Sequence, residues 1–174
     1  MWNGILWRQY SAAIDMLGGA IQACPDELWS EGSLPPRWSE SGVVGCWYLA
    51  YHTLFFLDCY LSGSLDGFSP PEPFTHDELD PAGVLPERVY TKTELLAYLA
   101  HGREKCRATL AALTEERAAE ICRYPWLSLG FGELLVNNLR HVQHHTAQLN
   151  LLLRQSTQSA PSWIATAGGS VQPS

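Results

Sequence analysis

The 174-residue chain has few charged residues, and most of those it has are acidic. Charged residues make up 17% of the sequence, and 18 acidic against 11 basic residues give a formal net charge of -7. Because no basic stripe runs along the chain, we expect neither a nucleic-acid backbone nor an anionic membrane surface as a partner. The length suits one domain with its own core.

Paired cysteines and common catalytic motifs are also missing. The five cysteines are scattered and never form CxxC, which predicts neither a disulfide framework nor a thiolate zinc site. No GxSxG, P-loop or GxGxxG motif occurs. The N-terminal stretch lacks a basic region, and Arg8 and Asp15 interrupt its apolar residues, so it does not resemble a signal peptide. We therefore expect a cytoplasmic protein.

Apolar residues recur at helical spacing in four long segments. The predicted helices cover about 3–23, 39–61, 91–113 and 130–155. Ser39 or Ser41 is expected to cap the second, and Thr91 and Glu94 have the spacing of a capping box at the start of the third. Thr114 is expected to cap a further short helix that ends near Glu120.

The segment 62–90 contains five prolines and is long for a connection. A long crossover allows the third helix to run parallel to the second. The sequence thus predicts an all-α fold: a four-helix bundle over residues 1–155, with up-down-down-up topology. The tail 156–174 should dock on it through Trp163 and Ile164.

The second helix is apolar almost all round and long enough to span a membrane. His52 and Asp58 lie inside it, however, which favours a helix buried on several sides in a protein core over a membrane span. Such an apolar helix, together with the scarcity of charge, leads us to expect a homodimer.

The last helix carries a pair of histidines on its apolar face. His141 and His145 are four residues apart and so project from the same side, whereas His144 points about 100° away. Two such imidazoles are either core side chains with hydrogen-bond partners or ligands of one metal ion. A metal satisfies both at once, and His52, in the middle of the second helix, is the natural third ligand.

Three neutral imidazoles with an open position form the ligand set of a catalytic metal site, with ring nitrogens about 2.0–2.2 Å from the ion. Imidazole suits zinc, nickel, copper or iron. Gln148 and Asn138 flank the histidines and are expected to orient a ligand or a bound water from outside the ligand shell. The alternative is a surface glutamine and a core asparagine bonded to a neighbouring backbone.

No side-chain base is evident from the sequence. Val142 stands where the HExxH motif of zinc proteases has its glutamate, and Asp58 lies about 120° around the helix from His52. Cys59 shares the face of His52, but a buried free cysteine is more often inert packing than a nucleophile. If the protein is an enzyme, the metal itself should therefore activate the nucleophile.

The segment from His141 to Leu149 resembles the last helix of the DinB-like (DinB/YfiT-like putative metalloenzyme) superfamily. The HxxxHxxQ pattern of that helix is met by His141, His145 and Gln148, and His52 stands where the third histidine of that family is expected. The resemblance implies a four-helix bundle with a long crossover, one divalent ion, most often nickel or zinc, and often a dimer.

The superfamily includes thiol S-transferases, a thiol-dependent isomerase and hydrolases. The resemblance thus predicts a metal-dependent enzyme that activates a low-molecular-weight thiol or a water for a small-molecule substrate. Two alternatives remain at this point. One is a non-catalytic metal-binding or stress-response module, and the other is a helical interaction protein whose histidines lie too far apart to share an ion.

Overall fold

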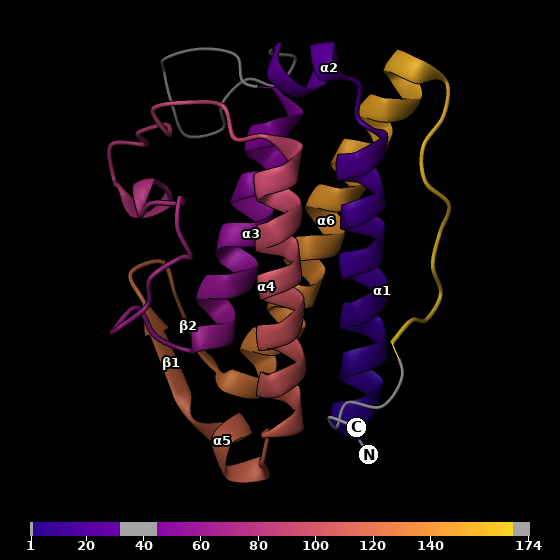
Figure 1. The fold of residues 1–174 in the computed structure, drawn as a ribbon. Helices are drawn as coiled ribbons and strands as arrows, with labels where there is room; N and C mark the ends of the chain where they lie inside the picture. Colours follow the sequence, from indigo (N-terminus) through magenta and orange to yellow (C-terminus); the bar gives the residue numbers. More distant parts are fainter. Residues whose placement is uncertain (1, 32–44, 169–174) are drawn as a thin grey trace.

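The computed structural model describes residues 2–31 and 45–168. This part of the chain contains six α-helices, one 3-10 turn and one two-stranded hairpin. The four longest helices are α1 (Trp2–Ala23), α3 (Cys46–Ser62), α4 (Lys92–Ala111) and α6 (Phe131–Thr157). They lie side by side (Figure 1): α3 packs against α4 and α6, and α1 packs against the same two helices.

The helix ends follow local chemistry. The predicted capping box of α4 is confirmed: the Thr91 hydroxyl accepts from the Glu94 N–H at 3.2 Å, and the Glu94 carboxylate accepts from the Thr91 N–H at 2.8 Å. Helix α3 begins later than predicted, with Gly45 as its N-cap, and Ser39 and Ser41 lie outside the described residues. It ends at Gly63, whose φ of 75° suits glycine.

Two small features are not visible in the apolar periodicity. Helix α2 (Asp26–Ser30) follows directly on Pro25, and a hairpin of β1 (Ile121–Tyr124) and β2 (Leu127–Gly130) joins the short helix α5 (Glu115–Ala119) to α6. The prediction of a purely helical chain is therefore wrong at the hairpin. Its strands are only four residues long, which is too short to stand out by alternation. The predicted cap of α5 is present, since the Thr114 hydroxyl accepts from the Arg117 N–H.

The crossover between α3 and α4 packs on these helices. The Tyr51 hydroxyl donates to the Thr75 carbonyl at 3.1 Å, and the ring of Phe74 stacks on Tyr98 with centroids 4.4 Å apart. The crossover also carries the 3-10 turn η1 (Asp77–Leu79). These contacts bring a stretch with little periodicity of its own against the middle of α3.

Helix α3 is buried within a single chain, as its apolar composition predicts. Thirteen of its 17 residues are buried, because α4, α6 and the crossover cover it. Within the described residues no helix has the length and apolar character needed to cross a membrane. The apolar residues of α3 therefore do not themselves require a second copy of the chain, and dimerisation stays a prediction.

The tail runs beside α1 (Figure 1). The Ala167 N–H donates to the Arg8 carbonyl at 3.3 Å, and the Gln9 amide donates to the Ala165 carbonyl at the same distance. The Trp163 side chain, however, is 67% exposed. Trp163 is therefore not an anchor, whereas the role of the half-buried Ile164 stays a prediction. The two hydrogen bonds to α1 are made by the tail's backbone.

Candidate metal centre

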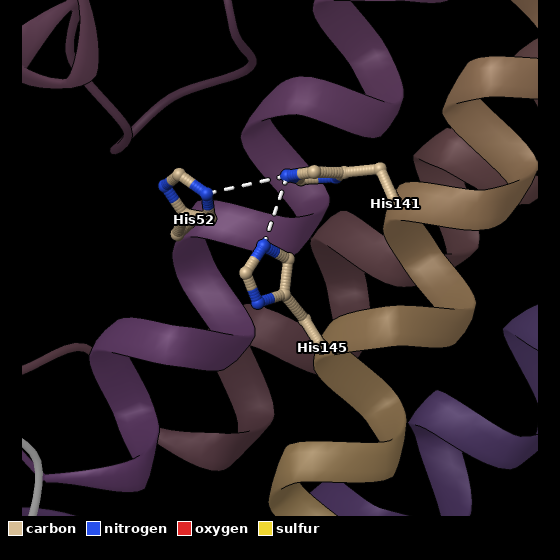
Figure 2. Close-up of side chains that lie close together, drawn as sticks. All are labelled: His52, His141 and His145. Carbon is tan, nitrogen blue, oxygen red and sulfur yellow. Dashed lines mark hydrogen bonds between the residues drawn. The ribbon is translucent and has the colours of Figure 1, made fainter. Parts of the chain in front are cut away.

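Three histidines from two helices converge in the interior of the protein (Figure 2). His52 projects from α3, and His141 and His145 project from successive turns of α6. The Nε2 atom of His141 lies 3.3 Å from Nε2 of His52 and 3.1 Å from Nε2 of His145. Each of the three residues offers a ring nitrogen within 4.8 Å of the others, so the group could hold one metal ion.

Two of the rings are oriented by partners on their outer nitrogens. His52 Nδ1 lies 2.7 Å from Glu78 Oε2, and His145 Nδ1 lies 2.7 Å from Gln148 Oε1. A carboxylate or an amide oxygen can only accept a hydrogen bond, so in each ring Nδ1 carries the proton. The Nε2 lone pairs of His52 and His145 therefore both point toward His141.

His141 stays neutral in this setting. Its burial, together with the neighbouring His52 and His145, lowers the pKa of His141 to about 2. Its Nδ1 atom is buried and has no hydrogen-bond partner among the described residues. The ring nitrogens of His52 and His145 thus both lie close to Nε2 of His141, in an arrangement that one shared cation could bridge.

The geometry fits a cation. Tetrahedral bonds of about 2.0–2.1 Å place ligand nitrogens roughly 3.3 Å apart, which agrees with the two separations at His141. Three neutral imidazoles suit zinc or nickel, and the donor set does not choose between them. A helical interaction protein with widely separated histidines is excluded by these distances.

The two residues expected to support the histidines lie differently. Gln148 lies against His145, so it is placed to orient that ring, and this role stays a prediction. Asn138 instead donates to the Leu57 carbonyl of α3 at 3.0 Å, so it is the core asparagine of the alternative interpretation. Cys59 is fully buried, and burial raises the pKa of its thiol to about 12. This burial disfavours a thiolate nucleophile.

Sequence reasoning missed Glu78. Its side chain is only 4% exposed, and η1 of the crossover places it on His52. It also lies near Tyr48, whose pKa is raised mainly by burial and further by this carboxylate. The helices indeed carry no acidic side chain into the site, but the crossover does. The only signal was the acidic pair Asp77-Glu78 in a segment without periodicity.

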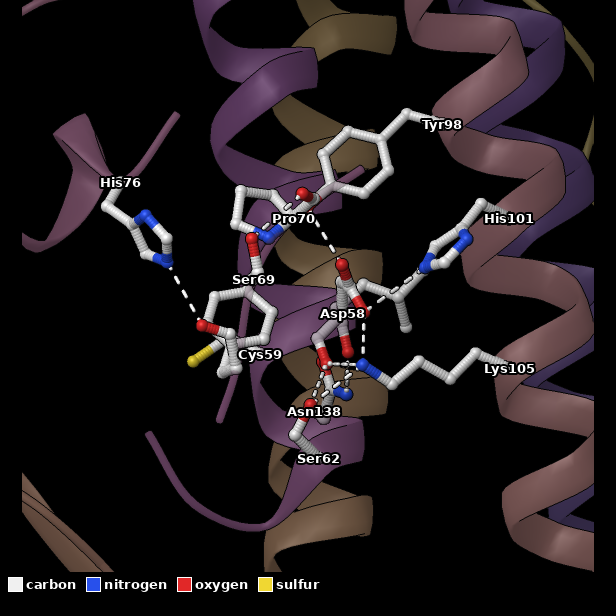
Figure 3. A network of polar contacts seen from close by, with 12 residues as sticks. Asp58, Cys59, Ser62, Ser69, Pro70, His76, Tyr98, His101, Lys105 and Asn138 are labelled. Atoms are coloured by element: carbon white, nitrogen blue, oxygen red, sulfur yellow. Dashed lines mark hydrogen bonds and ion pairs between the residues drawn. The ribbon is translucent and has the colours of Figure 1, made fainter. Parts of the chain in front are cut away.

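A second polar cluster lies on another side of α3, where Asp58 faces α4 (Figure 3). The buried Asp58 carboxylate pairs with Lys105, accepts from the Tyr98 hydroxyl at 3.1 Å and lies 3.6 Å from His101 Nε2. Lys105 also donates to the Ser62 hydroxyl at 2.7 Å. Asp58 thus faces away from the histidines, in agreement with its predicted angular position.

Comparison with known proteins agrees with this combination of long helices and a buried three-histidine group. The family model of the DinB superfamily matches residues 9–149. The chain therefore belongs to the DinB superfamily, as the histidine pattern predicted.

Among solved structures, a DinB-like protein of Bacillus subtilis, YjoA, is similar in fold. The TM-score is 0.60 at 16% sequence identity, and the match covers 91% of this chain and 96% of that one. At this identity the likeness concerns the fold alone. Among curated protein sequences no match is found.

Proposed function

We propose that the protein binds one divalent metal ion, zinc or nickel, through His52, His141 and His145, and that it is a metal-dependent enzyme. The observation that carries this proposal is the convergence of three imidazoles, whose ring nitrogens lie within 4.8 Å of one another. The proposal includes the up-down-down-up bundle of the family, which the pairwise packing of the four long helices supports.

A divalent cation at this position would lower the pKa of a coordinated thiol or water and so generate a nucleophile near neutral pH. The protein's own residues hold the site in shape. Glu78 and Gln148 fix the tautomers of His52 and His145, and the burial of His141 keeps its lone pair free of a proton. Between the two nucleophiles we favour a low-molecular-weight thiol, because a cation held by three neutral imidazoles would keep its full charge and favour a thiolate, and because the superfamily includes thiol S-transferases.

The test begins with metal content. Protein purified without a histidine tag should contain about one equivalent of zinc or nickel by elemental analysis. His141→Ala should lose it, whereas His144→Ala, which changes an exposed histidine of the same helix, should retain it. Wild-type protein that neither contains nor takes up either metal would contradict the proposal.

The reaction type is tested by X-ray absorption of the metal during a thiol titration. A sulfur scatterer that appears at saturating thiol supports thiol activation. Nitrogen and oxygen scatterers alone would remove the thiol version and leave hydrolysis or a non-catalytic metal-binding module. A closed site, in which a fourth protein ligand completes the coordination of the metal, would favour the non-catalytic metal-binding module.

A further inference from the structure

Three aromatic side chains border the histidines on the side of the hairpin. The ring of Phe56 lies 4.9 Å from His52 and 5.7 Å from His141, measured between centroids. Tyr60 lies 6.3 Å from His141, and Trp126 lies 5.9 Å from Phe56. The three side chains form a continuous aromatic wall that begins at the candidate metal ligands and extends outward to Trp126.

Trp126 is fixed in place although it is nearly half exposed. It sits in the two-residue turn between β1 and β2, and its side chain is 46% exposed. Its indole N–H donates to the Tyr60 hydroxyl at 3.0 Å. A large ring that is held by a hydrogen bond and still presents apolar surface to solvent is suited to contact a ligand, because little further ordering is needed.

The other flanks of the histidines are occupied by the protein. His145 is 5% exposed, and Gln148 lies on its outer nitrogen. Glu78 and Tyr48 lie on the outer side of His52. A ligand atom bound at the Nε2 cluster would therefore direct its substituent along the aromatic wall.

The aromatic character of the wall determines which kind of ligand substituent it would favour. The cation–π contacts among the described residues lie on other rings, at Trp29, Phe68, Tyr90 and Phe131. Within the described part of the chain, no cation–π contact thus falls on the rings of the wall, and the nearby Glu78 carboxylate disfavours an anionic substituent. Offset or edge-to-face contact with another flat ring is the interaction that such a surface favours.

We infer that Phe56, Tyr60 and Trp126 form a subsite for an aryl group, and that Trp126 determines a preference for aryl-bearing over alkyl ligands of the metal. This inference rests on the proposed function, because it places the ligand's donor atom at the three histidines. It adds a substrate class to that function: small molecules with a flat apolar ring near the coordinating atom.

The experiment uses the full-length protein loaded with Co²⁺, titrated with benzyl mercaptan and with ethanethiol. Binding is followed by the thiolate-to-cobalt absorption band. Wild-type protein should bind benzyl mercaptan roughly tenfold more tightly than ethanethiol. Trp126→Ala should remove most of that preference and leave the affinities for Co²⁺ and ethanethiol unchanged. Trp126→Phe, which keeps a ring but loses the bond to Tyr60, should be intermediate.

Trp163→Ala is the matched control, because it removes an exposed tryptophan from the tail beside α1. It should keep the full preference. Equal affinities for both thiols in the wild type, or a preference that survives Trp126→Ala, would overturn the subsite while leaving the metal proposal intact. Cobalt-loaded protein that binds neither thiol would overturn the subsite and the thiol version together. Failure to bind Co²⁺ at the histidines would instead overturn the proposed function on which the subsite depends.

Discussion

Helix α3 carries two buried polar clusters on different sides, and they differ in how their charges and lone pairs are balanced. Toward α4, the negative Asp58 has the cation of Lys105 and the hydroxyl donor of Tyr98 (Figure 3). Toward α6, three neutral bases face one another, and His141 Nδ1 has no partner among the described residues (Figure 2). The first cluster pairs charges of opposite sign, whereas the second brings three possible metal-ligand nitrogens to one point. Burial of polar groups alone does not mark a functional site, whereas the convergence of several metal-ligand atoms on one point indicates one.

The largest effect on metal affinity should come from removing one of the three converging histidines. His141→Ala leaves two imidazoles and should weaken zinc binding by more than about 100-fold, which exceeds the loss typical for residues that only support a ligand. Because a ligand that binds only the folded state stabilises it, zinc should raise the melting temperature of the wild type and not that of the variant. Calorimetric titration and thermal melts measure both. An unchanged zinc affinity would show that the metal binds elsewhere.

Substitutions in the cluster around Asp58 should change the stability of the fold and leave the metal affinity unchanged. Lys105→Met leaves the Asp58 carboxylate buried without its cation and should lower the free energy of unfolding by about 3 kcal/mol. The double variant Asp58→Asn/Lys105→Met removes both charges and should recover part of that loss. Urea denaturation reads out the change, and zinc affinity serves as the control. A loss below about 1 kcal/mol would mean that Tyr98 and His101 suffice to stabilise the carboxylate.

The residues that orient the histidines should have smaller effects. Glu78→Gln replaces a charged acceptor beside His52 and should weaken zinc binding by roughly 10- to 100-fold. Gln148→Ala removes a neutral acceptor from His145 and should lie at the lower end of that range, because a neutral hydrogen bond contributes less than a charged one. Equal zinc affinity in both variants and the wild type would assign these residues to packing alone.

The smallest effect is a pH dependence of the metal-free protein. The pKa of His141 is about 2 in the fold, against 6.5 for the free side chain, so only the unfolded chain takes up the proton below pH 6.5. The contribution of His141 to stability is therefore present above pH 6.5 and decreases as the pH falls, by at most about 1.4 kcal/mol per pH unit.

His141→Gln does not titrate and should flatten this slope between pH 6.5 and 5, as measured by urea denaturation. His144→Gln, at an exposed position of the same helix, is the matched control and should keep it. Identical slopes in the wild type and His141→Gln would contradict the prediction.

Local patterns in the sequence were enough to predict the elements with strong short-range signals. The 3.6-residue spacing of apolar side chains predicted the long helices, and the spacing of Thr91 and Glu94 predicted a cap. The i, i+4 spacing of His141 and His145 placed both on one face of α6, and their family pattern pointed to His52. These features depend on chain geometry over a few residues, so no knowledge of the tertiary structure was needed.

Which further residues contact the histidines became visible only in the packed fold. Glu78 reaches His52 through a crossover without periodicity, and Trp126 reaches Phe56 through a hairpin whose strands are too short to recognise. Asn138 shares the face of the histidines, yet it binds the backbone of α3 instead. Local periodicity fixes the direction of a side chain from its own helix. The partner that it meets depends on where loops and neighbouring helices pack, which is set by contacts far apart in the sequence.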